Sequence, residues 1–198
     1  MTKNKIAKIC IAIFIALCVG VFLTSWRAGA PTANASLEAV GMQVITALAS
    51  KDATTLADFV RPGGKVIISA FPSISEGNVT LSKEQMKAFF SDKTKYMWGY
   101  TDGKGDPIVL TPAEYYAQYL YKADFAHAPE RFYGQTQTSR GNNSNTISQI
   151  FPNAKVAEYH FPGSEKYGGM DWSSLKLVFE ESDGKWYLVA FANDQWGI

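Results

Sequence analysis

The pattern that most restricts the fold lies near the C-terminus, where Asp183-Gly184 joins two segments rich in aliphatic and aromatic residues. Asp-Gly is typical of a two-residue turn between antiparallel strands, and such a turn sets the strand register. We therefore predict a hairpin of 172–180 and 185–192 in which positions whose numbers sum to 367 are opposite each other. One face would carry Leu175, Leu177, Phe179, Leu188, Ala190 and Ala192 and end in Ser173 opposite Asp194. An apolar sheet face must be buried, so we expect helices to cover it.

The earlier part of the chain supplies candidates for those helices. Ser36 and Asp52 are potential N-caps, each followed by apolar residues at helical spacing. Ser82 with Gln85, and Thr111 with Glu114, match the capping-box pattern and predict two further helices. Strands are expected at 65–71, 96–100, 108–110 and 156–161, whereas 123–149 is weakly patterned apart from one helical turn near residue 148. These elements predict one α+β domain over 36–198, with N-terminal helices packed on a curved antiparallel sheet in a cone-like arrangement and a C-terminal three-strand meander.

The first 35 residues have the layout of a targeting segment. Three lysines precede an uncharged, mostly apolar run from Ile9 to Leu23, and no acidic residue occurs before Glu38. This is typical of a secretory signal, although the run extended to Trp26 is also long enough to suggest an uncleaved signal anchor. We expect 1–35 to be a signal peptide or signal anchor helix, with membrane contact through 9–26 if it is uncleaved. The remaining chain is expected to be extracytoplasmic, either secreted or membrane-anchored.

Charge and cysteine usage narrow the function classes. The chain has 19 Lys+Arg and 18 Asp+Glu, but four of the basic residues lie in 1–35, so the domain carries 15 basic and 18 acidic residues, a net charge of −3. This balance argues against nucleic-acid binding through a basic surface. Both cysteines, Cys10 and Cys18, lie in the targeting segment. Disulfides, cysteine-ligated zinc and thiol nucleophiles are therefore excluded from the domain.

Two resemblances follow from these patterns. The order helix, helix, strand, mixed middle and C-terminal meander is similar to the nuclear-transport-factor-2-like superfamily, which implies a cone of helices on a curved sheet. The stretches 98–103, 110–116, 159–163, 169–180, 184–189 and 194–196 resemble a group of uncharacterised exported proteins of Gram-positive bacteria. That second resemblance implies export and a similar fold, and it implies no activity, cofactor or catalytic residue.

The familiar catalytic motifs are absent. The chain contains no G-x-S-x-G, H-E-x-x-H, phosphate-binding glycine loop or EF-hand loop. Ser173 and Lys176 match S-x-x-K, but we place them on a strand, where they are not one helical turn apart. Two histidines are too few for a histidine-rich metal site, although His160 and Glu158 share a predicted strand face. We predict no cofactor and no metal. The predicted register also places His160 and Asp194 on opposite faces, which argues against an acid–base dyad.

Asp194 is the strongest candidate for a functional side chain, because a carboxylate at the end of an apolar face either bonds to its neighbours or lines a pocket. The domain is rich in aromatics, most of them expected in the core. Trp98, Trp172 and Trp196 are predicted to be exposed at strand ends or beside loops. The candidate ligand-binding set is Asp194, Ser173, Tyr159, Trp98, Trp172 and Trp196. It predicts non-catalytic binding of a small molecule or a cell-envelope partner; the alternatives are a cofactor-free hydrolase or isomerase using Asp194, and a structural protein with no pocket.

Overall fold

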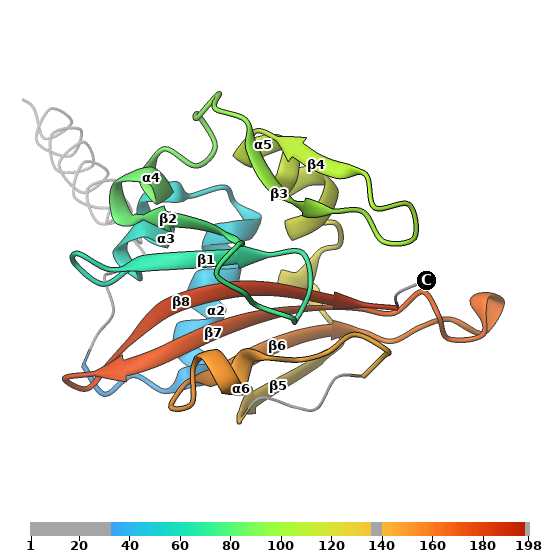
Figure 1. The fold of residues 1–198 in the computed structure, drawn as a ribbon. Coiled ribbons are helices and arrows are strands. Elements are labelled where there is room, and N and C mark those ends of the chain that lie inside the picture. The colour runs from blue at the N-terminus through green and yellow to red at the C-terminus, as the bar shows by residue number, and fades with distance from the viewer. Residues whose placement is uncertain (1–32, 136–139, 197–198) are drawn as a thin grey trace, which may run out of the picture.

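The computed structural model describes residues 33–135 and 140–196, so nearly all of the predicted targeting segment lies outside the described residues. The described chain is α+β, as predicted, with a mixed six-stranded sheet, a separate two-stranded sheet and short helices (Figure 1). The strands are β1 Lys65–Ser69, β2 Val79–Ser82, β3 Tyr96–Tyr100, β4 Pro107–Leu110, β5 Glu130–Gly134, β6 Lys155–Phe161, β7 Ser173–Ser182 and β8 Lys185–Gln195. The α-helices are α2 Leu37–Ala49, α3 Ala53–Asp58, α4 Lys83–Lys87, α5 Pro112–Tyr115 and α6 Ile147–Ile150. Within the described ranges, no helix is both long and apolar enough to cross a membrane.

The helix starts are where the local sequence predicts them. Ser36 caps α2 by accepting from the Ala39 N–H, and Asp52 caps α3 by accepting from the Thr55 N–H. Both predicted capping boxes form, at α4 and at α5. The helix after Pro112 continues as a π-helical turn, Tyr116–Leu120, closed by a bond from the Tyr121 N–H to the Tyr116 carbonyl. The polar and capping signals therefore specify helix starts, while helix length depends on later packing.

The strand order of the large sheet is β2-β1-β8-β7-β6-β5. The predicted β6-β7-β8 meander is confirmed. The prediction of an antiparallel sheet is wrong in one respect: β1 pairs with β8 in parallel, so the sheet is mixed. Strands β2 and β5 were not predicted; they form the two edges and complete the sheet by antiparallel pairing with β1 and β6.

A β-bulge interrupts the predicted register of the hairpin. Asp183 and Gly184 both have positive φ, as the predicted turn requires, and the pairing follows the predicted register from Ser182 to Phe179. Phe179 is opposite Leu188, but Val178 is opposite Ala190, so Val189 is an extra residue on β8. Every later residue of β8 is consequently one position out of the predicted register. The prediction that Ser173 is opposite Asp194 is therefore wrong.

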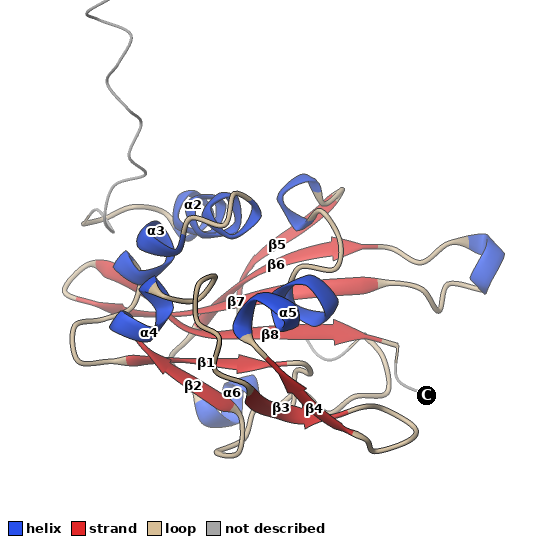
Figure 2. Ribbon diagram, turned by 90° about the horizontal axis from the view of Figure 1, so that it is seen from above, coloured by secondary structure: helices blue, strands red, loops and turns tan. Residues whose placement is uncertain are grey.

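The two faces of the sheet have different coverings. Leu175, Leu177 and Phe179 face the main core with α2 and α3, which confirms that helices cover this apolar face. Phe191 and Asn193 replace the predicted Ala190 and Ala192 on that face beyond the bulge. The opposite face has a smaller apolar cluster that includes Ile147 of α6 (Figure 2). We call these the helix face and the α6 face.

Candidate functional site

The bulge turns Asp194 onto the α6 face, where it meets Lys176. Lys176 Nζ donates to Asp194 Oδ2, and neither side chain has any exposed surface. Asp194 Oδ1 has no hydrogen-bond partner among the described residues. Charged groups are almost never fully buried unless they are paired. Lys176 and Asp194 are therefore a buried ion pair in the middle of the sheet.

A second group of hydrogen-bonded polar residues, His160, Ser174 and Glu158, lies on the same face, so the prediction that His160 and Asp194 are on opposite faces is wrong. The Ser174 hydroxyl donates to Glu158 Oε1 over 2.7 Å, and His160 Nδ1 lies 2.8 Å from Ser174 Oγ. Since that hydroxyl proton is already used, the Nδ1–H of His160 donates to Ser174. Arg140 Nε donates to the same Glu158 oxygen over 3.1 Å and is the cation that balances this buried carboxylate. The bonds thus run from His160 through Ser174 to Glu158.

Burial is the main cause of the pKa shifts of Asp194 and His160. It raises the pKa of Asp194, and the neighbouring Lys176 cation only partly opposes this. It lowers the pKa of His160, helped by the positive charge of Arg140. Nucleophilic catalysis would need the hydroxyl of Ser174 to donate towards a histidine, whereas here it donates to a carboxylate. This geometry is that of a structural network, and it does not activate Ser174.

The structure does not bring the predicted site residues together. Asp194 and Trp172 lie on the α6 face, where the Trp172 ring is 5.9 Å from that of His160. Tyr159 and Trp98 lie in the main core instead. Trp98 stacks on Tyr115 and donates its indole N–H to the Leu110 carbonyl, which a buried indole requires.

The exposure predicted for the tryptophans holds at one of three positions. Trp98 and Trp172 are buried, at 1% and 8% exposure, so those two predictions are wrong. Trp196 is 42% exposed, as predicted. It lines a shallow depression of about 580 Å³ with Tyr167 and Met170. Ser173 is buried and pairs across the sheet with Gln195.

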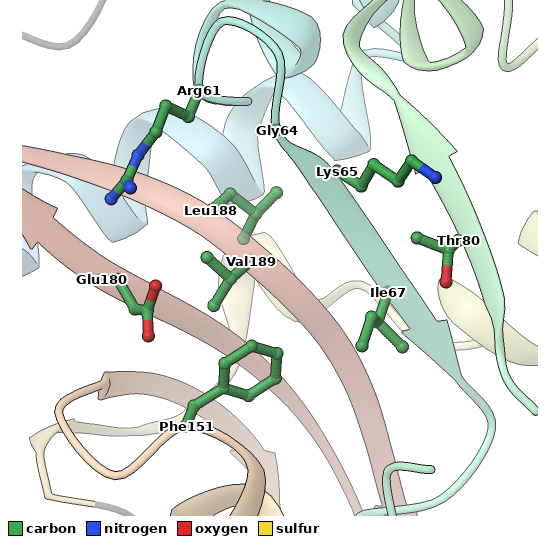
Figure 3. A pocket seen from close by; sticks show the side chains of 9 residues that line it. All are labelled: Arg61, Gly64, Lys65, Ile67, Thr80, Phe151, Glu180, Leu188 and Val189. Atoms are coloured by element: carbon green, nitrogen blue, oxygen red, sulfur yellow. The ribbon is translucent and has the colours of Figure 1, made fainter. Parts of the chain in front are cut away.

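A better-formed pocket, of about 300 Å³, lies on the α6 face at the bulge (Figure 3). Its apolar walls include Ile67 of β1, Val189 at the bulge and Phe151 after α6. These three side chains form the apolar floor of the pocket, and Arg61 and Glu180 lie on one side of it. Arg61 also packs over the Tyr187 ring, 5.2 Å from its centroid. The Lys65 side chain lies across the floor, next to β2 (Figure 3). We call this the bulge pocket. It was not predicted, and its local signal in the sequence is the Arg61-Pro62-Gly63-Gly64 turn beside a strand rich in β-branched residues.

A smaller and more polar crevice, of about 160 Å³, lies at the end of β8. Asn193 and Gln195 line it from the sheet, Asp102 from the β3–β4 turn, and Tyr119 and Lys122 from the π-helical turn and the residues after it. We call it the Asn193 crevice. The bulge creates it, because the predicted register would have directed Asn193 to the α6 face.

No group of three or more His, Cys, Asp or Glu side chains within 33–135 and 140–196 is arranged to hold a metal ion. Comparisons with protein-family models, with curated proteins and with solved structures find no match to this chain. We therefore infer function from the geometry of the pockets.

Proposed function

We propose that the chain is an exported domain, secreted or held at the membrane by its N-terminal segment, that binds a small ligand without catalysis. The observation that carries this proposal is the bulge pocket, where apolar walls lie between cationic side chains. Small-molecule sites are mostly apolar cavities of about 300–1,000 Å³ with a few polar groups that orient the ligand. The bulge pocket has this composition and lies at the lower end of that size range.

The chemistry of the lining favours a ligand with an apolar body and one negative charge. Two cations, Arg61 and Lys65, accompany a single carboxylate, Glu180, so the lining has a net charge of +1. A guanidinium binds a carboxylate with two parallel hydrogen bonds, and the apolar floor covers the rest of the ligand. At about 30 Å³ per water-sized group, the cavity accommodates roughly ten non-hydrogen atoms. A small aromatic or aliphatic carboxylic acid fits both limits.

Phenylacetate is a suitable probe because it has about ten non-hydrogen atoms and a single charge. The full-length chain in mild detergent, with labelled Ile, Leu and Val methyl groups, would be titrated and followed by NMR. We expect saturable shifts at Ile67 and Val189 and none at Leu175, which lies on the helix face. Neutral phenylacetamide and cationic phenethylammonium have nearly the same shape, so they isolate the contribution of charge. Equal affinity for all three would contradict an anion-selective site.

Arg61→Gln tests which side chain recognises the charge. It should weaken phenylacetate binding about tenfold, the usual value of a hydrogen bond to a charged group, and leave phenylacetamide binding unchanged. Lys93→Gln removes one exposed positive charge outside the pocket and is the matched control. A similar loss in both variants would mean that the net charge of the domain, and not the pocket, attracts the anion.

The proposed location depends on the N-terminal segment. Mass spectrometry of the protein recovered from an expressing bacterium distinguishes cleavage within or directly after 1–35 from an intact anchor. Recovery of the intact chain in the cytosolic fraction would contradict export. The cone-like arrangement implied by element order belongs to the same proposal.

The alternative of a hydrolase or isomerase using Asp194 has less support. Asp194 is fully buried against Lys176 and is absent from the linings of all three pockets described above. A catalytic carboxylate must come within hydrogen-bond reach of its substrate. For that reason we assign Asp194 to the structural network.

A further inference from the structure

Three large apolar side chains are exposed together around the shallow depression that contains Trp196. Tyr167 and Met170 come from the loop between β6 and β7, and Trp196 follows β8. Their exposed fractions are 51%, 53% and 42%, respectively. The charged residues Lys166 and Asp171 complete the lining. A contiguous apolar group with polar neighbours is typical of an interaction site, whereas single exposed apolar residues are not. We call this site the loop depression.

The loop that carries Tyr167 and Met170 is held by its own hydrogen bonds. The Asp171 carboxylate accepts from the Ser164 N–H over 2.6 Å and from the Ser164 hydroxyl over 2.8 Å. The Gly169 N–H donates to the Ser164 carbonyl over 2.8 Å. Because these bonds join the two ends of the loop, Tyr167 and Met170 are presented from a fixed backbone. A preformed surface avoids the cost of ordering a loop when a partner binds.

The charged residues of the loop depression balance each other. Lys166 and Asp171 contribute one charge of each sign, and the Lys166 ammonium lies over the Tyr167 ring, 4.8 Å from its centroid. The bonds from Ser164 lower the pKa of Asp171, so this group is a carboxylate at neutral pH. A lining without net charge favours a neutral partner. The excess of acidic residues in the domain also acts against an anionic one.

The shape of the loop depression favours a polymer. Sites for free small molecules enclose most of the ligand surface, whereas this depression is shallow. A long chain needs no such enclosure, because several of its units contact the surface at once. Tyrosine and tryptophan have an apolar body and a polar tip, so they suit units with the same division. Sugar rings have it, since their C–H face is apolar and their edge carries hydroxyl groups.

The loop depression lies far from the point where the chain enters the domain. The Asn34 N–H donates to the Gly184 carbonyl over 2.8 Å, so residue 34 is held at the β7–β8 turn. The β6–β7 loop is at the other end of β7, which has 10 residues and is roughly 33 Å long. Figure 1 shows this turn and this loop at opposite ends of the sheet. With the N-terminal segment in the membrane, as proposed above, the loop depression is at the end of the domain farther from it.

We propose that the loop depression binds a neutral polysaccharide of the cell envelope, with sugar rings stacked on Trp196 and Tyr167. The Lys166 ammonium donates to oxygens of the polymer, and the Met170 side chain packs against its C–H groups. The site shares no lining residue with the bulge pocket. The meeting with an envelope polymer rests on the proposed export, whereas binding to the isolated polymer does not.

Chitohexaose, the neutral hexamer of N-acetylglucosamine, is the probe. The full-length chain in phosphatidylcholine nanodiscs, which carry no sugar headgroup, would be labelled at methionine methyl groups and tryptophan indoles and titrated by NMR. We expect saturable shifts of the Met170 and Trp196 signals and none at Trp98, which lies in the main core. Monomeric N-acetylglucosamine should bind at least about tenfold more weakly, because it cannot contact both rings at once. Hexagalacturonate, a hexamer with a carboxylate on every ring, should also bind more weakly than chitohexaose.

Four results would contradict the proposal. The absence of a saturable shift up to roughly 10 mM chitohexaose would exclude even weak specific binding. Equal affinity for the monomer and the hexamer would overturn the assignment to a polymer, and equal affinity for hexagalacturonate would overturn the assignment to a neutral one. A gadolinium-chelating lipid in the nanodiscs should leave the Met170 signal sharp, whereas broadening would assign the loop depression to the membrane surface. The titration requires neither export nor a ligand in the bulge pocket, so its failure is distinguishable from failure of the proposed function.

Two tyrosine variants provide a matched comparison. Tyr167→Ala should weaken chitohexaose binding about tenfold, because the ring contributes both stacking and buried apolar area. Tyr100→Ala removes a ring of similar exposure, 58%, from β3 outside the loop depression, and it should leave the affinity unchanged. Both side chains are exposed, so both variants should fold, and both should retain the phenylacetate shift at Ile67. Equal chitohexaose affinities in the two variants would overturn the assignment of the site.

Discussion

The Lys176–Asp194 pair allows a sharp test of the structural network. Replacing Lys176 with Met keeps most of its apolar stem but leaves the Asp194 carboxylate buried with no cation and with neither oxygen bonded by a side chain. Removing one partner of a buried pair typically costs about 3–5 kcal/mol. A domain of this size has a total stability of about 5–15 kcal/mol, so the variant should be close to its unfolding threshold. For a urea m value of about 2 kcal/mol/M, the unfolding midpoint should fall by roughly 1.5–2.5 M.

The double variant gives the decisive comparison. Lys176→Met combined with Asp194→Val removes both charges, and replacement of a buried pair by apolar groups is often neutral or stabilising by about 1–4 kcal/mol. The two single losses should therefore be strongly non-additive in a double-mutant cycle. Lys83 and Asp58, an ion pair of 3.3 Å near the surface, is the matched control, and Lys83→Met should cost less than about 1 kcal/mol. Equal losses for Lys176→Met and Lys83→Met, or additivity in the cycle, would refute our interpretation.

Three further predictions concern other parts of the network and the fold. Because burial lowers the pKa of His160 in the folded state, the unfolded state binds more protons below pH 6.5, so stability should fall as the pH falls from 6.5 through the folded-state pKa. His160→Gln should flatten this decrease in urea titrations between about pH 7 and pH 5, and an unchanged slope would assign it to other groups. Gly41→Ala would place a Cβ 2.9 Å from both Ala157 Cβ and Tyr159 Oη, and should cost about 1–3 kcal/mol in thermal unfolding despite the better helix propensity of alanine. Deleting Val189 removes the bulge but preserves every residue pair on either side of it, so this variant should fold. Deleting Ala192 turns Asp194 towards the helix face and should prevent folding. Circular dichroism distinguishes the two outcomes, and equal tolerance of the two deletions would contradict the observed register.

Features determined by neighbouring residues could be predicted from the sequence. Ser36 and Asp52 cap helices as expected, and Thr111 with Glu114 forms its capping box. The Asp183-Gly184 turn adopts the predicted conformation because both residues accept positive φ. Each of these signals acts over four residues or fewer. The export signal is also a local pattern, and it remains a prediction because 1–32 lies outside the described residues.

Features determined by distant residues could not be predicted in the same way. The sequence of the strand at 65–69 does not indicate whether it pairs parallel or antiparallel to β8. The edge strand Glu130–Gly134 is mostly exposed or half-buried, so it lacks the alternation that identifies a strand with one buried face. Trp98 lies between the exposed Met97 and the half-buried Gly99, and the Tyr115 ring that stacks on it belongs to another element. In each case the outcome depends on contacts with a strand or side chain that is distant in the sequence.

The structural network and the bulge pocket depend on a single residue that the hairpin pattern conceals. Val189 is β-branched and half-buried, as an ordinary strand residue would be, and nothing in the turn at 183–184 indicates that the ladder slips five residues later. That slip places Asp194 with Lys176, directs Asn193 into its crevice and adds Val189 to the floor of the bulge pocket. Bulges are frequent next to functional sites because one extra residue re-aims every side chain that follows it. The bulge therefore decides that Asp194 is a partner of Lys176 on the α6 face, which the hairpin pattern alone did not indicate.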